Sequence, residues 1–553
     1  MQKLEIPSIQ EFLEKSCRKF GNRAQFSVLE LDSAGRANIN SITGLDFLAK
    51  VNDLRRRQAV AGIGADSRVA MLGESSVDWI ANFFAALSVG STICSIDIKW
   101  TPHEIDTVLS HYQGSHLIVS DAWWEKALQF IAVKDHQVKL IRLSDFAKFS
   151  ESILEEIPAR SDRMSDLVLY TSGSTGSPKG VVLPISAVLY EAGILAYSFE
   201  PPPEELRVLF SLLPLNHVYG LSSGLFVTME GGYELCLSQS VNPQHIQQIL
   251  RERKVRRFFT IPLFLNLIKN SVEAKVQNQP LMKRLIFRLA MALNQRLKSE
   301  RIAKVFFKPI REALSDTLEF FVSGGAPLDV KTARFFSAVG WPVYNGYGLT
   351  ETGPVIAVNT ADYHRDGSVG KPLAGVDVKI VATGDNENPN VGEIWVKGPN
   401  VFTEYYREPV LTSEAKNAQG WFRTGDLGTL DSDGYLSIVG RRKSLIVLSS
   451  GKKVQPEEVE EILEQNPQLK ASCLTLVKKQ GTEILVAIIE LRDEVWDAER
   501  VQGITADLKK RCEVLAPYKR PQEIRLRKTP FQMTSSQKVK RHVVQYEIDK
   551  GLL

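Results

Sequence analysis

The chain has few cysteines, and no two of them form a close pair. Its 553 residues include only five, which are spread along the whole length: Cys17, Cys94, Cys236, Cys473 and Cys512. No C-x-x-C pair is present. This spacing speaks against a disulfide framework or a zinc site, and it fits a reducing compartment.

Long hydrophobic runs are missing as well. No apolar stretch approaches about 18 residues, so we expect no membrane-spanning helix. The first residues lack the apolar segment of a secretory signal peptide. Charge of one sign is not in excess, because the formal net charge is +4, and this value gives no reason to expect a nucleic-acid partner. We therefore expect a cytoplasmic protein.

The length and the pattern of the first part of the chain indicate an α/β protein with more than one domain. A chain of 553 residues is too long for a single core. Short apolar runs that read as buried strands occur at 67–72, 90–97 and 116–119. They alternate with helical patterns at 9–20, 43–60 and 78–87. Such alternation predicts a doubly wound α/β layer with parallel strands.

A segment rich in glycine and hydroxyl residues follows the apolar run 166–170. Glycine lets the backbone turn sharply and direct several N–H groups at one anion, while hydroxyls and a lysine add further donors. The predicted phosphate-binding residues are Thr171, Ser172, Gly173, Ser174, Thr175, Gly176 and Lys179. The segment is not a Walker A loop, because Lys179 is followed by Gly180 and not by Ser or Thr. A plain surface loop is the alternative interpretation.

Two later segments place small and polar residues at the ends of predicted strands. The apolar run 317–322 ends in the sequence S-G-G-A-P-L, where glycines would let a flat ligand lie against the backbone. The run 341–344 is followed by N-G-Y-G-L-T-E-T-G. This second segment fails the dinucleotide pattern, because Glu351 stands where the third glycine should be. Glu351 is a hard oxygen ligand suited to Mg²⁺.

These segments together resemble the adenylate-forming superfamily, and in particular the long-chain fatty acyl-CoA synthetases. The motifs occur in the family's order, and the resemblance covers nearly the whole chain. It implies binding of ATP or AMP by the phosphate loop and by Gly324, Gly325, Ala326, Pro327, Asn345, Gly346, Tyr347 and Gly348. It further implies contact of Thr350 with the α-phosphate, a Mg²⁺ ion on Glu351, and ribose contacts from Asp426 and Arg441.

His217 follows the predicted strand 207–213 and resembles the family's histidine that lines the carboxylate site. A packed or solvated histidine is the alternative. The stretch that follows, 220–224, also matches the hydrolase pattern G-x-S-x-G and names Ser222 as the nucleophile of a serine esterase. That pattern needs a strand running directly into its first glycine, and Pro214 and Asn216 interrupt the strand too early.

The resemblance implies the adenylate-forming enzyme fold. We expect an α/β large N-terminal domain with parallel sheets at 1–440, with a small β-rich subdomain at about 355–440, and a small α+β C-terminal domain at 441–553 on a hinge at Lys443. The family's catalytic lysine matches Lys538, with Lys540 as the alternative, although Gln537 stands where the family has glycine. Gly451, Lys452, Lys453 and Lys519 are candidates for binding coenzyme A.

The implied function is activation of a fatty acid by ATP, with Mg²⁺, through an acyl-adenylate that is then transferred to the thiol of coenzyme A. Loading of a carrier protein is the alternative outcome. The segment 281–312 holds nine basic and two acidic residues, and Leu285, Leu289 and Leu293 recur in it at helical spacing. It is either a basic amphipathic element that contacts an anionic membrane or a helical insertion packed on the domain with a solvated face.

Overall fold

The computed structural model describes residues 8–32, 34–133, 137–149, 166–171, 178–383, 390–448, 452–479, 482–492, 497–534 and 538–552. The described chain divides into two compact units. The first holds the residues up to 377 together with 397–420, and the second holds 378–396 and the chain from 421 onward. The domain boundary at residue 440 stays a prediction.

A nine-stranded sheet dominates the first unit. Its order is β15 (Lys371–Pro372), β14 (Ala357–Val358), β13 (Val343–Tyr347), β12 (Phe320–Ser323), β11 (Arg257–Thr260), β9 (Val208–Ser211), β10 (Glu234–Ser238), β1 (Ala24–Leu31) and β2 (Ala37–Thr43). The strands from β13 to β1 are parallel, and antiparallel strands close both edges. The carboxyl ends of the parallel strands therefore meet at one edge, where ligands bind in folds of this kind.

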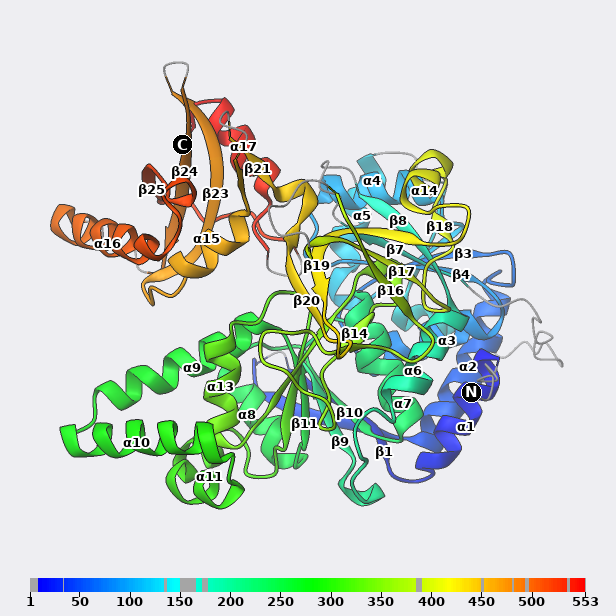
Figure 1. Cartoon of the computed structure of the whole chain (residues 1–553). Helices are drawn as coiled ribbons and strands as arrows, with labels where there is room; N and C mark the ends of the chain where they lie inside the picture. The colour runs from blue at the N-terminus through cyan, green and yellow to red at the C-terminus, as the bar shows by residue number, and fades with distance from the viewer. Residues whose placement is uncertain are drawn as a thin grey trace. The chain divides into compact units, whose positions relative to one another are not determined.

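A second sheet of seven strands lies in the same unit (Figure 1). Its order is β18 (Glu404–Tyr405), β8 (Lys179–Pro184), β7 (Asp166–Thr171), β4 (Thr92–Ile96), β3 (Arg68–Leu72), β5 (His116–Val119) and β6 (Lys139–Arg142). The strands from β7 to β6 are parallel, and β8 and β18 add antiparallel pairs at one edge. The doubly wound α/β layer predicted from the sequence is confirmed.

Helices connect the strands of the first unit, and their ends carry the expected signals. They are α1 (Ile9–Phe20), α2 (Gly44–Val60), α3 (Val77–Ser88), α4 (Pro102–Tyr112), α5 (Trp124–Val133), α6 (Ile185–Leu195), α7 (Val227–Gly231), α8 (Pro243–Glu252), α9 (Pro262–Gln277), α10 (Leu281–Leu297), α11 (Glu300–Phe306), α12 (Lys308–Leu314), α13 (Val330–Val339) and α14 (Pro409–Ala415). Helix α4, for example, begins with Thr101, Pro102 and Glu104, which form a capping box with proline in the first turn.

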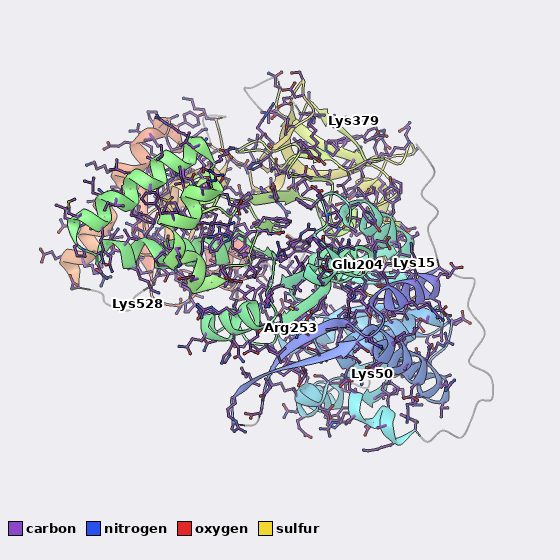
Figure 2. All side chains as sticks on the ribbon, turned by 90° about the horizontal axis from the view of Figure 1, so that it is seen from below. Lys15, Lys50, Glu204, Arg253, Lys379 and Lys528 are labelled. Atoms are coloured by element: carbon purple, nitrogen blue, oxygen red, sulfur yellow. The ribbon has the colours of Figure 1, made fainter. Side chains whose placement is uncertain are left out.

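The described part of the second unit contains a four-stranded sheet, a three-stranded sheet and a two-stranded sheet. The four-stranded sheet has the order β16 (Asp377–Val381), β17 (Gly392–Lys397), β19 (Phe422–Leu430) and β20 (Leu436–Arg441). Lys379 of β16 is labelled in Figure 2. Its Nζ lies 4.9 Å from the ring centre of Trp395 on β17 and 4.1 Å from that of Trp421, which precedes β19. The three-stranded sheet consists of β23 (Leu469–Lys479), β24 (Thr482–Leu491) and β25 (Glu523–Arg527).

Three helices accompany the three-stranded sheet: α15 (Pro456–Leu463), α16 (Ala498–Arg511) and α17 (Arg541–Asp549). Two short strands, β21 (Ile446–Val447) and β22 (Lys453–Val454), pair with each other. This small α+β arrangement agrees with the fold that the sequence predicted for the C-terminal domain. No helix among the described residues is long and apolar enough to cross a membrane.

Candidate active site

A row of polar side chains crosses three parallel strands of the nine-stranded sheet at their carboxyl ends. Thr260 ends β11, Ser323 ends β12, and Asn345 stands beside Ser323 on β13, in one register. Thr260 Oγ1, Ser323 Oγ and Asn345 Oδ1 are buried and have no hydrogen-bond partner in the described part of the chain. Buried polar atoms normally have partners, so this edge of the sheet is suited to a polar ligand such as a nucleotide.

The predicted adenine-binding residues lie around this row. Gly324, Gly325, Ala326 and Pro327 form the turn after β12, and Asn345, Gly346 and Tyr347 belong to β13. At Gly325 the backbone φ is +79°, and a Cβ there would meet no atom within 4 Å, so the space above this turn is open. Gly348 has a different role, because a Cβ on it would lie 1.7 Å from the carbonyl oxygen of Pro354.

Glu351 and Lys179 both lie beside Tyr405. Glu351 stands with Thr350 in the turn η5 (Thr350–Thr352), and its Oε1 accepts a hydrogen bond of 2.9 Å from the Tyr405 hydroxyl. Lys179 begins β8, which pairs with the strand of Tyr405, and its Nζ is 5.6 Å from the Tyr405 ring centre. The pKa of Tyr405 is raised, mainly by burial and to a smaller extent by the nearby charge of Glu351. A carboxylate and an ammonium group thus flank one phenol.

This arrangement fits a Mg²⁺ ion bound with phosphates. No group of three His, Cys, Asp or Glu side chains that could hold a metal occurs within the described ranges. Mg²⁺ usually takes one or two protein carboxylates and completes its ligand set with water and substrate phosphates. Glu351 alone would therefore suffice as the protein ligand. Thr171 ends β7 opposite Lys179, and Ser172, Gly173, Ser174, Thr175 and Gly176 lie outside the described residues.

His217 lies close to an acidic residue that the sequence analysis did not single out. Its Nε2 is 3.3 Å from Oδ2 of Asp97, and Asp97 is buried. Asp97 follows β4 of the seven-stranded sheet, whereas His217 follows β9 of the nine-stranded sheet. The carboxylate faces the ring nitrogen and would help to fix the orientation of the imidazole. The signal that could have found Asp97 is its place at the carboxyl end of a buried strand.

Ser222 does not occupy the position of a hydrolase nucleophile. The pattern G-x-S-x-G lies inside the π-helix η4 (Tyr219–Phe226), not at a turn between a strand and a helix. Ser222 is fully buried, and its hydroxyl donates a hydrogen bond of 2.7 Å to Glu191. Glu191 also accepts a bond from the backbone N–H of Val355, and burial raises the pKa of Glu191 to about 8. The pair packs the core, and the esterase interpretation has no support.

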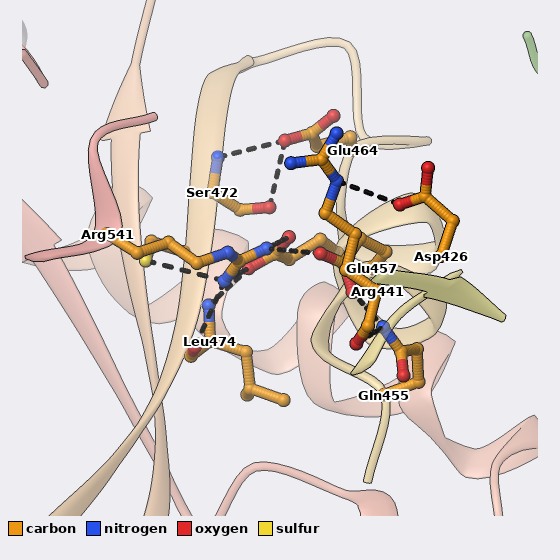
Figure 3. Close-up of polar contacts among 10 residues, drawn as sticks. Asp426, Arg441, Gln455, Glu457, Glu464, Ser472, Leu474 and Arg541 are labelled. Atoms are coloured by element: carbon orange, nitrogen blue, oxygen red, sulfur yellow. Dashed lines mark hydrogen bonds and ion pairs between the residues drawn. The ribbon is translucent and has the colours of Figure 1, made fainter. Parts of the chain in front are cut away.

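The second unit brings together the predicted ribose-binding residues. Asp426 on β19 and Arg441 on β20 are register partners, and Nε of Arg441 is 3.1 Å from Oδ1 of Asp426 (Figure 3). Asp426 is buried, whereas Arg441 is about half exposed. A buried carboxylate in this position is suited to accept hydrogen bonds from the hydroxyls of a ribose. Lys443 lies in the turn η6 (Arg442–Ser444), its side chain lies outside the described residues, and its role as a hinge stays a prediction.

Lys538 belongs to the same unit and lies within electrostatic range of Asp426 and Arg441. It stands in a tight hairpin, because Met533 pairs with Val539 and the N–H of Lys538 donates to the hydroxyl of Thr534 at 3.0 Å. Gln537, which replaces the family's glycine, lies outside the described residues. The backbone N–H of Lys540, the alternative lysine, donates a hydrogen bond of 2.8 Å to the carbonyl of Gln532, and the choice between the two lysines stays a prediction.

Arg541 anchors the hairpin of Lys538 to α15. Its guanidinium donates hydrogen bonds to Glu460 and to the carbonyl of Leu474, and it lies 3.5 Å from Oε1 of Glu457 (Figure 3). Glu460 is buried and also accepts a bond of 2.6 Å from the N–H of Leu474. Arg541 is three positions after Lys538, so this contact fixes the start of α17 and with it one side of the lysine hairpin.

The pKa of Lys538 leads to a testable pH dependence. The pKa of Lys538 is lowered to about 8, mainly by burial and then by the charge of Arg441, whereas the charges of Asp426 and Glu457 raise it. If the ammonium form is the active one, adenylate formation should fall as the pH rises from 7 through 8 to 9. Replacing Glu457 by Gln removes a charge that raises the pKa, so the midpoint should move to lower pH. The measurement is the pH profile of the first half-reaction; a flat profile or an upward shift would refute it.

The candidate coenzyme A residues are partly engaged within the second unit. Lys519 forms an ion pair of 2.7 Å with Glu458, and Nζ of Lys452 is 4.6 Å from the ring centre of Tyr518. Gly451 and the side chain of Lys453 lie outside the described residues. Lys519 would therefore have to exchange its carboxylate partner for a phosphate, whereas Lys452 is exposed.

Comparison with known protein families identifies the family of the chain. Residues 13–406 match the model of a family described as AMP-binding enzyme. The chain belongs to this family. The polar row on β11 to β13 and the pair of Glu351 and Lys179 lie within the matched residues of this AMP-binding enzyme.

Curated relatives of this AMP-binding enzyme are between 26% and 28% identical to it over the aligned residues. It is 28% identical to a long-chain-fatty-acid–CoA ligase, FadD15, of Mycobacterium bovis, over 79% of this chain and 75% of that protein. It is 27% identical to fatty acyl-CoA synthetase A of Dictyostelium discoideum, over 76% and 67%. It is 26% identical to a long-chain-fatty-acid–[acyl-carrier-protein] ligase, AEE15, of Arabidopsis thaliana, over 74% and 67%.

Solved structures show the same fold. An anthranilate CoA ligase, AuaEII, in complex with anthranoyl-AMP superposes with a TM-score of 0.78 at 19% identity, over 99% of this chain and 98% of that chain. The o-succinylbenzoate CoA synthetase MenE of Bacillus subtilis, in complex with its acyl-adenylate, gives a TM-score of 0.77 at 22% identity, over 97% of both chains. The fold of this AMP-binding enzyme is therefore that of the adenylate-forming enzymes.

Proposed function

We propose that this AMP-binding enzyme activates a fatty acid with ATP and transfers the acyl group to the thiol of coenzyme A. The proposal rests on the family match and on the names of its curated relatives. The observation that carries it is the pair of Glu351 and Lys179 beside Tyr405. Glu351 also follows β13, the strand that holds Asn345 of the polar row. This set of groups is suited to a triphosphate with its metal ion.

In the proposed first step, a carboxylate oxygen of the fatty acid attacks the α-phosphorus of ATP. The P–O bond to pyrophosphate breaks, and an acyl-adenylate forms. No general base is needed, because the carboxylate is already ionised. The main barrier is repulsion between negative charges, which Lys179, Lys538 and the loop N–H groups would offset. Glu351 would hold Mg²⁺, which neutralises phosphate charge when bound.

In the proposed second step, the sulfur of coenzyme A attacks the carbonyl carbon of the adenylate, and AMP leaves. Lys452 and Lys519 would contact phosphates of coenzyme A. A carrier protein is the alternative acceptor, since one curated relative is named as a carrier-protein ligase.

Replacing Lys452 and Lys519 together by alanine should raise the KM for coenzyme A by about fivefold to tenfold, as expected for lost contacts with phosphate. Adenylate formation should not change, because neither residue has a role in the first step. The matched control is Lys479→Ala, which also removes a lysine from an ion pair of this unit, that with Glu523 at 3.0 Å. An unchanged KM in the double variant would remove these lysines from the acceptor site.

The acceptor itself is tested by a thiol screen against a panel of fatty acids. The enzyme is incubated with ATP, Mg²⁺ and each acid, with coenzyme A or a holo carrier protein at equal low concentration. The proposal predicts acyl-CoA and AMP as products. Preference for the carrier protein would support the alternative, and hydrolysis of an ester without ATP would contradict both.

A further inference from the structure

The exposed hydrophobic side chains of this protein gather in one short segment. Of the 24 large hydrophobic residues that are exposed in the described chain, nine lie between residues 281 and 306. Four of them form a ridge along α10 at a spacing of four residues, namely Leu281, Leu285, Leu289 and Leu293, with exposures between 48% and 75%. Isolated exposed leucines are ordinary, but a contiguous ridge indicates a binding surface.

The ridge is not the face by which α10 packs on the protein. Ala290 and Asn294 are buried. The side-chain amide of Asn294 donates a hydrogen bond of 2.7 Å to the carbonyl of Ala338, which lies in the last turn of α13. Phe287 and Met291 pack against the core on the same side. The leucines lie on a helix, as their spacing in the sequence predicts. Their side chains point away from the core and do not anchor the helix.

Helix α10 runs beside α9, and the two helices extend together from the first unit (Figures 1 and 2). The same segment also carries exposed basic residues, namely Lys283, Arg288, Arg296, Lys298 and Lys304. Segment 281–312 contains nine basic and two acidic residues, although the whole chain has a net charge of only +4. The surface is therefore both apolar and strongly positive.

We propose that α10 docks on the surface of an anionic lipid bilayer. The leucine ridge enters the boundary of the acyl chains, and the basic residues contact the phosphate headgroups, as in amphipathic helices that lie in the interface. Charge argues against a second copy of the chain as the occupant, because two such segments would repel each other. A ridge of leucines on a protruding helix needs a soft apolar partner, which a bilayer provides without a matching groove.

This docking goes beyond the proposed reaction and needs neither ATP nor a thiol. Failure of vesicle binding and failure of fatty-acid activation are therefore separate results. For the reaction, docking would bring the enzyme to the phase in which long-chain acids are concentrated. Activity on a soluble short-chain acid should then be independent of the ridge.

The test is cosedimentation of the full chain with vesicles of phosphatidylcholine, with and without phosphatidylglycerol. We expect binding to the anionic vesicles that weakens with salt. Leu285→Gln combined with Leu289→Gln and Leu293→Gln should weaken it by about tenfold or more, since each change removes apolar contact with lipid. Lys283→Glu combined with Arg288→Glu should weaken it comparably.

The matched control replaces three exposed valines elsewhere, Val241, Val410 and Val514, by glutamine and should bind like the unmutated protein. Because a triple change could disturb folding, the single variant Leu281→Gln, at the most exposed ridge position, is measured as well, together with thermal unfolding. Absence of vesicle binding, or binding that ignores the ridge variants, would overturn the proposal. Dimerisation of the unmutated protein through the ridge, or binding of the ridge only to an acidic protein, would also overturn the proposal.

Discussion

The Lys538→Ala variant should form acyl-adenylate about a hundredfold more slowly or worse, a loss of about 3 kcal/mol of transition-state stabilisation. The reason is that the ammonium group offsets the charge of the carboxylate and the phosphates in the first step. Thioester formation from pre-made acyl-adenylate should stay largely intact, because that step does not need this cation. Both half-reactions are measured separately under single-turnover conditions.

Two further variants make the result specific to Lys538. Lys540→Ala also removes one positive charge, two positions further along the chain. Because Lys540 is not the assigned catalytic lysine, this variant should leave both half-reactions nearly unchanged. Arg541→Lys keeps a cation but weakens the forked contact with Glu460 that anchors the lysine hairpin, so it should slow the first step only partly. If Lys540→Ala reproduced the selective loss, the assignment would be shifted by two residues. If Lys538→Ala slowed both half-reactions equally with the fold intact, its assigned role would be wrong.

Glu351→Gln should be the second severe variant, with adenylate formation lowered by about a hundredfold or more through loss of a metal-binding carboxylate. The Mg²⁺ concentration needed for half-maximal rate should rise as well. Glutamine keeps the size of the side chain and can still accept the hydrogen bond from Tyr405. The measurement is the rate of the first half-reaction as a function of Mg²⁺ concentration.

The matched control is Tyr405→Phe, which removes the hydroxyl that donates to Glu351 at 2.9 Å and leaves the carboxylate in place. Loss of one hydrogen bond to a charged group lowers the free energy of unfolding by about 1.5–3 kcal/mol. The Mg²⁺ concentration needed for half-maximal rate should change little. Equal effects of both variants on rate and on Mg²⁺ dependence would mean that Glu351 serves only to hold Tyr405. That result would remove the proposed metal ligand.

Much of the fold could be predicted from the sequence because its signals are local. The apolar runs that became β3, β4 and β5 are continuous in the chain, and the helices between them have the expected period. The places of Ser323 at the end of β12 and of Glu351 shortly after β13 could be predicted for the same reason. The family resemblance added roles for these residues, which local patterns alone do not supply.

The remaining features depend on contacts between distant parts of the chain. Tyr405 reaches Glu351 from 54 residues away, and Asp97 meets His217 from a different sheet, so neither contact leaves a pattern in the sequence. The pattern around Ser222 matched a hydrolase motif, but only the structure places it within a helix. For α10, the period identified an apolar face, whereas the orientation of that face depends on the packing of Asn294 and Ala290.

The central claim is that this AMP-binding enzyme forms an acyl-adenylate from a fatty acid. It is tested most directly by the exchange of radiolabelled pyrophosphate into ATP, because only reversal of adenylate formation carries the label back. The account predicts exchange that requires both Mg²⁺ and a fatty acid, proceeds without coenzyme A, and is nearly abolished in Lys538→Ala. Exchange that is absent with every fatty acid of the panel, or that proceeds without any acid, would contradict it.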